Sequence, residues 1–281
     1  MSATTAPNTE VASPAVRSFV DLVDRRIGVQ LAGKEYLIES RLQTVAREQG
    51  LSSVDDVLAA IHRGDRRLAD VAVEAMTTNE TSFFRDQHPF TALAENVLPD
   101  VARRNDGRLT VWNGACSSGQ ESYTLAMTIV DNVPALAGPG RTRIISTDVS
   151  PEMVKRTQAG EYSRFEVNRG LPANLAVKHF DQMGRKWVAK PALRAMVETH
   201  EMNLLERWNG IPRCDVVLLR NVLIYFTVEA RRDILQRIRT DVLKPGGCLL
   251  LGASETTTGI DPGYESRRVG SSTFYYPKGT S

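Results

Sequence analysis

A run of small residues between a strand pattern and a helix pattern constrains this chain most. The run extends over residues 114–119, after the apolar Leu109, Val111 and Trp112 and before helix-favouring residues from Gln120 onward. A strand, a small-residue loop and a helix form the first unit of an open α/β sheet, where a ligand approaches the backbone and the helix N-terminus offers amide donors. The spacing is not the dinucleotide G-x-G-x-x-G, so a tight turn that binds nothing is the alternative.

Composition narrows the class of protein. A chain of 281 residues with 42% hydrophobic and 24% charged residues is predicted to form one large domain plus a small one. The formal net charge of +2 disfavours a nucleic-acid partner. Three cysteines without C-x-x-C spacing and four scattered histidines predict a reducing compartment and no metal site.

The N-terminal region predicts a tail followed by a helical domain. Residues 1–14 are rich in Thr, Ala, Pro and Ser and lack a signal-peptide pattern, which predicts a disordered tail. No apolar run approaches a membrane span, so we expect a cytoplasmic protein without membrane insertion. Residues 15–76 show helical periodicity, including helices over 34–49, after a Ser52 or Ser53 cap, and from Leu68.

Residues 77–90 break this helical pattern. Polar side chains there are followed by Phe83 and Phe84 and then by Arg85, and exposing two aromatic rings would be costly. We interpret the stretch as a linker laid over the active site of the larger domain. A linker whose aromatic rings only fill a groove is the alternative.

Residues 91–281 are predicted to form the larger, α/β domain. Ile144 and Ile145 indicate a second buried strand that ends at Asp148, where an acid can accept the ribose hydroxyls of an adenosine. Residues 214–221 indicate a third strand, 248–252 a fourth, and 264–277 an antiparallel closing hairpin. Alternating strands and helices of this kind predict a nucleotide-cofactor domain with ligands at the carboxyl ends of the strands.

Several blocks of the sequence resemble the chemotaxis receptor glutamate O-methyltransferase family (CheR-type). They are Thr-Thr-Asn-Glu-Thr-Ser-Phe-Phe-Arg-Asp from residue 77, Ala-Cys-Ser-Ser-Gly-Gln-Glu from 115, Thr147-Asp148, Asn203-Leu204, Arg-Asn-Val-Leu-Ile-Tyr-Phe from 220, and Leu-Lys-Pro-Gly-Gly from 243. The blocks stand in family order and cover nearly the whole chain from about Phe19.

The resemblance implies a fold, a cofactor and a partner. The fold is a Rossmann-like class I methyltransferase sheet with a C-terminal antiparallel hairpin, a small β-subdomain insertion and an all-α N-terminal domain. The cofactor is S-adenosyl-L-methionine, which leaves as S-adenosyl-L-homocysteine. The implied reaction, carried out by a monomer, converts glutamate side chains on the cytoplasmic helical bundle of a methyl-accepting chemoreceptor into methyl esters.

The resemblance also implies a set of site residues. Two of them, Arg85 and Tyr225, would face the reacting centre, with Arg85 orienting either the substrate or the cofactor. The residues that would contact the cofactor are Asn79, Thr81, Arg85, Glu121, Asp148, Asn203, Leu204, Arg220 and Asn221.

One stretch departs from the family pattern. The segment between Phe180 and Trp187 is short, whereas members that dock on a pentapeptide tether at the receptor C-terminus have a longer, glycine-richer loop there. We therefore expect this chain to act without that tether.

The chemistry of the implied reaction needs no general base. A glutamate carboxylate is already ionised at neutral pH, and its attack on a sulfonium methyl is an in-line displacement governed by positioning. Two alternatives stay open: a methyltransferase for another substrate, such as a nucleic-acid base or a small molecule, and a cofactor-binding signalling adaptor without transferase activity. Amine-directed enzymes often carry Asn/Asp-Pro-Pro-Tyr/Phe where this chain has the Arg220 block.

Overall fold

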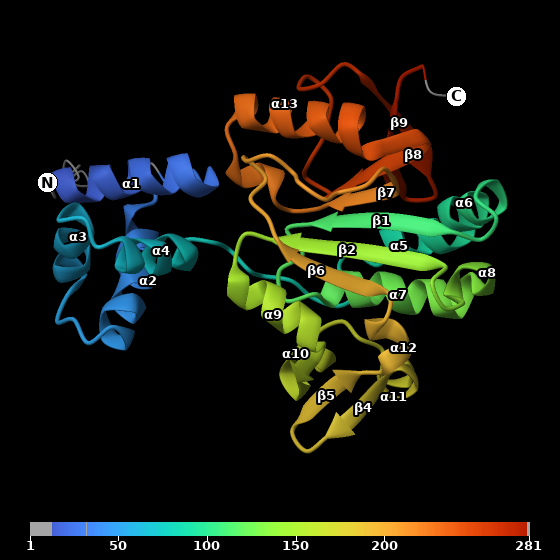
Figure 1. Cartoon of the computed structure of the whole chain (residues 1–281), viewed down its shortest axis with the longest axis horizontal. Coiled ribbons are helices and arrows are strands. Elements are labelled where there is room, and N and C mark those ends of the chain that lie inside the picture. The colour runs from blue at the N-terminus through green and yellow to red at the C-terminus, as the bar shows by residue number, and fades with distance from the viewer. Residues whose placement is uncertain (1–12, 32, 280–281) are drawn as a thin grey trace, which may run out of the picture. The chain divides into compact units, whose positions relative to one another are not determined.

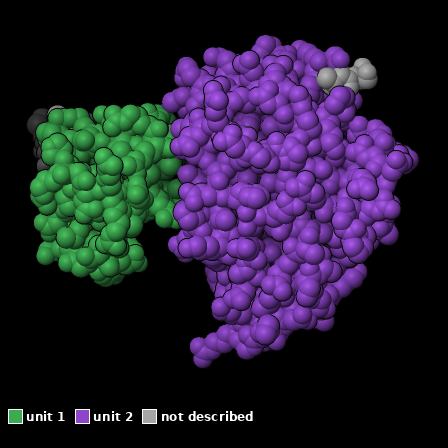
Figure 2. Space-filling view, in the orientation of Figure 1, with its two compact units in different colours: residues 1–77 green, residues 78–281 purple. Residues whose placement is uncertain are grey.

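The chain folds into two compact units. The computed structural model describes residues 13–31 and 33–279, and it divides the chain between Thr77 and Thr78 (Figure 2). Most of the tail predicted over residues 1–14 lies outside the described residues. Its last two residues are described, and there Ser13 is the N-cap of the first helix, accepting a hydrogen bond from the Val16 amide.

The smaller unit consists of four helices within its described residues: α1 (Pro14–Ile27), α2 (Glu35–Glu48), α3 (Val54–His62) and α4 (Arg66–Ala75). Side chains of Ser53 and Asp65 cap α3 and α4 by accepting backbone N–H bonds, as N-cap residues do. The buried residues recur at helical spacing, as in Phe19, Val23 and Ile27 of α1.

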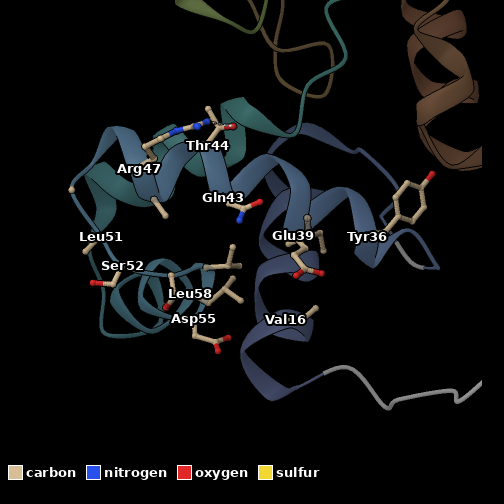
Figure 3. A pocket seen from close by; sticks show the side chains of 15 residues that line it. Val16, Tyr36, Glu39, Gln43, Thr44, Arg47, Leu51, Ser52, Asp55 and Leu58 are labelled. Atoms are coloured by element: carbon tan, nitrogen blue, oxygen red, sulfur yellow. Dashed lines mark hydrogen bonds between the residues drawn. The ribbon is translucent and has the colours of Figure 1, made fainter.

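A groove of about 1370 Å³ opens on this smaller unit (Figure 3). Its walls come from α2, α3 and the turn between them, and they include the charged Glu39, Arg47 and Asp55 beside the apolar Leu58. Tyr36 at its edge is 68% exposed.

The larger unit contains a seven-stranded sheet in the order β6-β2-β1-β7-β8-β10-β9 (Figure 1). The strands are β1 (Leu109–Gly114), β2 (Thr142–Asp148), β6 (Val197–Glu201), β7 (Cys214–Leu219), β8 (Leu243–Leu251), β9 (Tyr264–Val269) and β10 (Ser272–Pro277). The pairs from β6 to β8 are parallel, and β10 pairs antiparallel with both β8 and β9. This confirms the predicted class of sheet and its closing hairpin.

Both faces of the sheet are apolar, because helices cover both. In Figure 1, α7 (Gln120–Asn132) lies on one face and α13 (Val228–Arg237) on the other. Successive residues of a strand therefore enter different cores: Val111 packs in the α7 cluster and Trp112 in the α13 cluster. The remaining helices before the insertion are α5 (His88–Ala92), η1 (Leu93–Val97), α6 (Leu98–Arg104), α8 (Pro134–Ala137) and α9 (Pro151–Ala159). Two short helical segments adjoin α13: η2 (Leu223–Tyr225) and η3 (Ile238–Val242).

An insertion between α9 and β6 forms the predicted β-subdomain. Its elements are β3 (Glu161–Ser163), α10 (Arg164–Asn168), α11 (Ala173–His179), β4 (Phe180–Met183), β5 (Lys186–Ala189) and α12 (Pro191–Arg194), with sheet order β3-β5-β4. Among these three strands the sequence pattern indicates only β5, where Lys186-Trp187-Val188 is typical of a short strand. The sequence pattern does not indicate β6, because Val-Glu-Thr-His-Glu has no apolar alternation. This half-exposed edge strand forms through its backbone pairing with β2.

The start of β8 differs from the prediction. Residues 244–247 are predicted as a turn before the strand, but they lie within β8. The pairing shifts between Cys214↔Leu243 and Val216↔Cys248, so the extra β8 residues form an irregularity in the ladder. Glycine and proline therefore mark a bulge here.

Residues 78–90 pack as part of the larger unit. The ring of Phe83 is 1% exposed and makes edge-on contacts with Tyr162 and Phe180 of the insertion, with centroids 4.9 and 5.6 Å away. The Phe84 amide donates to the hydroxyl of Thr124 on α7 at 3.1 Å. The close approach of this segment to the insertion also requires a glycine at position 170. An added Cβ on Gly170 would lie 2.1 Å from the carbonyl oxygen of Phe83.

The described residues form neither a membrane-spanning helix nor a cluster of metal ligands. None of their helices combines the length and the apolar character that crossing a membrane requires. Within residues 13–31 and 33–279, no group of three or more His, Cys, Asp or Glu side chains is placed to hold a metal ion.

We predict that Phe83→Ala destabilises the larger unit by about 3–5 kcal/mol, because it leaves a cavity among three packed aromatic rings. The matched control is Phe165→Ala, which removes a ring that is 76% exposed. Chemical denaturation followed by tryptophan fluorescence measures both. Equal losses for the two variants would contradict the packing role of Phe83.

Candidate active site

The predicted site residues gather at the carboxyl ends of the parallel strands. The loops after β1 and β7 and the segment over residues 78–90 contain non-glycine residues with left-handed φ: Phe84, Asp86, Gln87, Ala115, Ser117 and Asn221. Each such conformation costs on the order of 1–3 kcal/mol and persists only where surrounding contacts enforce it. Strain is therefore concentrated around one region of the sheet edge.

Packing explains the small residues of the loop after β1. An added Cβ on Gly114 would lie 2.9 Å from the Leu219 side chain, and one on Gly119 would lie 2.8 Å from Thr157. Gly119 also has φ of 89° at the N-cap of α7. The loop is thus pressed between β7 and α9, which brings its backbone close to the strand ends.

Asp148 lies at the carboxyl end of β2 and is 5% exposed. Its Oδ2 accepts the Ser117 amide at 2.8 Å, and its Oδ1 accepts the Ser150 amide at 3.0 Å. These two bonds fix the carboxylate between the loop after β1 and the start of α9. A buried acid in this place is the group that the sequence assigns to a ribose.

The segment over residues 78–90 contacts the same loop. The Ser117 hydroxyl donates to the carbonyl of Asn79 at 2.8 Å, so Asn79 is joined through Ser117 to Asp148. Glu80 forms an ion pair with Arg169 of the insertion. Thr81, the next residue after Glu80, is half-buried. These bonds attach the segment to the loop after β1 and to the insertion, and its position over the active site stays a prediction.

Arg220 is the buried cation of the region. Its side chain is 1% exposed and forms ion pairs with Glu121 on α7 and, at 2.6 Å, with Asp86. A third bond runs from its Nη2 to the carbonyl of Arg85 at 3.1 Å, and its guanidinium lies 5.6 Å from the ring centroid of Phe90. Three of the predicted residues thus meet here, and sequence analysis did not assign Asp86.

The electrostatics of this region suit a cation. The region contains three carboxylates, on Asp86, Glu121 and Asp148, and two guanidinium groups, one on Arg220 and one on the half-buried Arg85. The Nε of Arg220 is buried without a hydrogen-bond partner among the described residues, so an acceptor supplied by a ligand would complete it. An excess of negative charge fits a ligand that carries a sulfonium.

Asn203 and Leu204 follow the neighbouring strand β6. The Met202 amide donates to the Asp148 carbonyl at 2.9 Å, which places the start of this loop beside the acid. The Asn203 carboxamide accepts the Leu205 amide at 3.0 Å. Leu204 is 6% exposed and packs in the core that α13 covers.

Asn221 and Tyr225 lie in the loop after β7. Asn221 has φ of 58°, and Tyr225 is half-buried in the short helix η2. The amide of Asn221 donates to the carboxylate of Glu255, a residue that sequence analysis did not assign. Its signal in the sequence is the one that identified Asp148: an acid shortly after a buried strand.

Cys116 stands in the loop after β1 but is not a nucleophile. Burial, with the nearby negative charge of Asp148 as a lesser cause, raises the pKa of its thiol far above the usual range. Its Sγ lies 3.7 Å from the hydroxyl of Thr157. A thiol held neutral in this way packs as a small buried side chain.

Comparison with known proteins identifies the family. The model for the CheR methyltransferase SAM binding domain matches residues 79–269, and the model for the CheR all-alpha domain matches residues 14–77. The chain belongs to the CheR methyltransferase family. The family resemblance found in the sequence is confirmed.

The chain also matches curated chemotaxis protein methyltransferases over most of their length. The chain is 40% identical over 248 residues to chemotaxis protein methyltransferase 1 of Pseudomonas aeruginosa, covering 86% of this chain and 90% of the relative. It is 38% identical over 262 residues to chemotaxis protein methyltransferase Cher2 of Pseudomonas putida, covering 91% and 95%. A chemotaxis protein methyltransferase of Vibrio parahaemolyticus is 36% identical over 264 residues, covering 92% and 95%.

The cofactor prediction is confirmed at the level of the family. The protein is a methyltransferase that binds S-adenosylmethionine, and its matched SAM binding domain includes every residue of the sheet edge described above. The excess negative charge and the orphan Nε of Arg220 fit this cofactor. The individual roles given to Asn79, Thr81 and the other predicted site residues stay predictions.

We predict that Asp148→Ala weakens binding of S-adenosylhomocysteine by about 10- to 100-fold, because a hydrogen bond to a charged group contributes about 1.5–3 kcal/mol. Calorimetric titration measures the affinity, and circular dichroism checks that the fold is intact. The control Asp181→Ala changes an exposed acid on β4 and keeps the affinity. An unchanged affinity in a folded Asp148→Ala variant removes the ribose assignment.

We predict that Arg220→Met destabilises the larger unit by about 3–5 kcal/mol, because it removes the buried partner of Glu121, whose side chain is 13% exposed, and of Asp86, whose side chain is 33% exposed. The control is Arg103→Met, whose side chain is 72% exposed. There the lost pair with Asp100 costs about 1 kcal/mol or less. Urea denaturation measures both, and a loss at Arg220 no larger than that at Arg103 would show that the buried pair is not structural.

Proposed function

We propose that this methyltransferase transfers the methyl group of S-adenosylmethionine to glutamate side chains on the cytoplasmic helical bundle of a chemoreceptor. The product is a glutamyl methyl ester. The family match and the names of the curated relatives support a role in chemotaxis. The observation that carries the proposal is the joining of the segment bearing Arg85, the buried Arg220 and the loop bearing Tyr225 at one edge of the sheet.

A carboxylate is the acceptor that this set of side chains suits. The cofactor supplies an electrophilic methyl group on a sulfonium. A glutamate is ionised at neutral pH, so it needs no residue to remove a proton. The region contains acids that are already paired, Asp86 and Glu121 with Arg220, and none of them is required as a base.

Positioning is the contribution we assign to the protein. The Nη1 of Arg85 donates to the Glu80 carbonyl at 3.2 Å, and its remaining donors form a fork that matches a carboxylate. The Tyr225 hydroxyl can donate one hydrogen bond to the attacking glutamate. Together they would hold the acceptor oxygen in line with the methyl group, which is where most of the rate gain is expected.

The β-subdomain supports action without a pentapeptide tether. β4 ends at Met183 and β5 begins at Lys186, so the connection is a tight turn in which Gly184 has φ of 62°. We propose that this short hairpin lacks the longer loop on which tethered members dock. Calorimetric titration with such a pentapeptide should show no binding at micromolar concentration, and a micromolar affinity would overturn this part of the proposal.

A labelled-methyl assay tests the reaction. Purified receptor cytoplasmic fragments are incubated with the enzyme and radiolabelled S-adenosylmethionine, and the label is then exposed to mild base. Glutamyl methyl esters release the label as methanol, whereas methyl groups on nitrogen stay bound. Base-stable label would indicate another acceptor, and no label with intact cofactor binding would indicate an adaptor.

We predict that Tyr225→Phe lowers the methylation rate by about 10-fold or more, as expected for one hydrogen bond to a charged group, with cofactor affinity unchanged. The control is Tyr276→Phe, which alters another half-buried tyrosine. Tyr276 lies beside the start of β8, at the end of the sheet opposite to the candidate site. Steady-state assays on the receptor fragment separate the rate from the affinity. Full turnover by Tyr225→Phe contradicts a role for its hydroxyl.

A further inference from the structure

Glu255 is a buried carboxylate that binds backbone amides from two strand ends. It is 8% exposed and lies shortly after β8. Its Oε2 accepts the amides of Asn221 and Gly252, each at 2.7 Å, and its Oε1 accepts the amide of Ile224 at 3.3 Å. An acid with three backbone donors ties the loop after β7 to the loop after β8.

The same loop is held from its other side by a cation. Arg231 on α13 donates from Nε to the carbonyl of Phe226 at 2.9 Å and from Nη2 to the carbonyl of Ile224 at 3.2 Å. Glu255 therefore binds amide donors of the loop, and Arg231 binds its carbonyl acceptors. Tyr225 lies between these attachment points.

Gly252 shows how closely the two loops approach. An added Cβ would lie 2.7 Å from the Asn221 carboxamide nitrogen, 2.7 Å from Oε2 of Glu255 and 2.8 Å from the Asn221 amide. Only glycine leaves room for the carboxylate to reach both strands. The left-handed φ of Asn221 is a strained conformation that these contacts enforce.

We propose that Glu255 is a positioning residue for methyl transfer, fixing the loop that carries Asn221 and Tyr225 without touching the reactants. The inference rests on the function proposed above, because Tyr225 is assigned to the reacting centre there. Glu255 fixes the backbone on both sides of Asn221 and immediately before Tyr225. Its loss should therefore affect the rate of transfer more than the binding of the receptor.

Amide hydrogen exchange tests the clamp independently of activity. In Glu255→Gln the single carbonyl oxygen can keep the Asn221 and Gly252 amides, so exchange at the Ile224 amide should accelerate selectively. In Glu255→Ala exchange at all three amides should accelerate. The matched control is Tyr275→Phe, which removes only the 3.4 Å bond from its hydroxyl to the Glu255 carbonyl. Unchanged exchange at all three amides in Glu255→Ala would overturn the proposal.

Kinetics test the consequence for catalysis. At saturating cofactor, Glu255→Gln should lower kcat at least about 10-fold with the receptor KM within about twofold, since a 1 Å misplacement costs on the order of 100-fold. Tyr275→Phe should keep kcat, and Glu255→Asp should recover part of it, providing the comparison if the Gln variant does not fold. A kcat for Glu255→Gln within about twofold of Tyr275→Phe would overturn the positioning role. If the wild-type enzyme transferred no methyl group, the proposed function would be overturned. The exchange data would still show whether Glu255 holds the amides of Asn221, Ile224 and Gly252.

Discussion

The ion pairs of Arg220 are the interaction on which the rest of the site depends. A guanidinium that is 1% exposed is stable in a protein interior only with acidic partners, and here one comes from α7 and the other from the segment ahead of α5. Three separate parts of the chain are thereby fixed at one point: Glu121, Asp86 and the end of β7. The need to neutralise the buried guanidinium of Arg220 thus holds these three parts of the site together.

Other contacts extend the same arrangement outward. Asp148 binds the loop after β1 and the start of α9, and Ser117 passes this connection on to Asn79. Glu255 connects the ends of β7 and β8 in the same way, by accepting the amides of Asn221 and Gly252. At Asp148 and at Glu255 a buried carboxylate accepts backbone amide donors at a strand end. The carboxyl edge of the sheet is thus stabilised by side chains that satisfy its orphan amides.

The central strands of the large sheet and its main covering helices could be predicted from the sequence, because they depend on local apolar periodicity. Residues such as Val111 and Trp112 enter opposite cores, which gives the continuous apolar runs of a doubly covered sheet. Edge strand β6 and the strands β3 and β4 lacked that signal, since their pairing is set by partners distant in sequence. Most candidate site residues came from recognised motifs. Asp86 was missed because its role arises only from its tertiary contact with Arg220. Glu255 follows a buried strand, as a candidate acid does, but the loop whose amides it accepts is distant in sequence.

The packing of residues 78–90 determines where the catalytic module begins. Phe83 fills a gap among rings of the insertion, Asp86 neutralises Arg220, and Asn79 binds Ser117. A shortened chain that starts at Thr78 would retain all of these groups. One that starts at Thr91, inside α5, would lack the Phe83 ring that packs on Tyr162 and Phe180, and would leave the buried Arg220 without Asp86. Residues 78–90 therefore belong with the larger unit, and an engineered exchange of the helical unit would have to join the chains before Thr78.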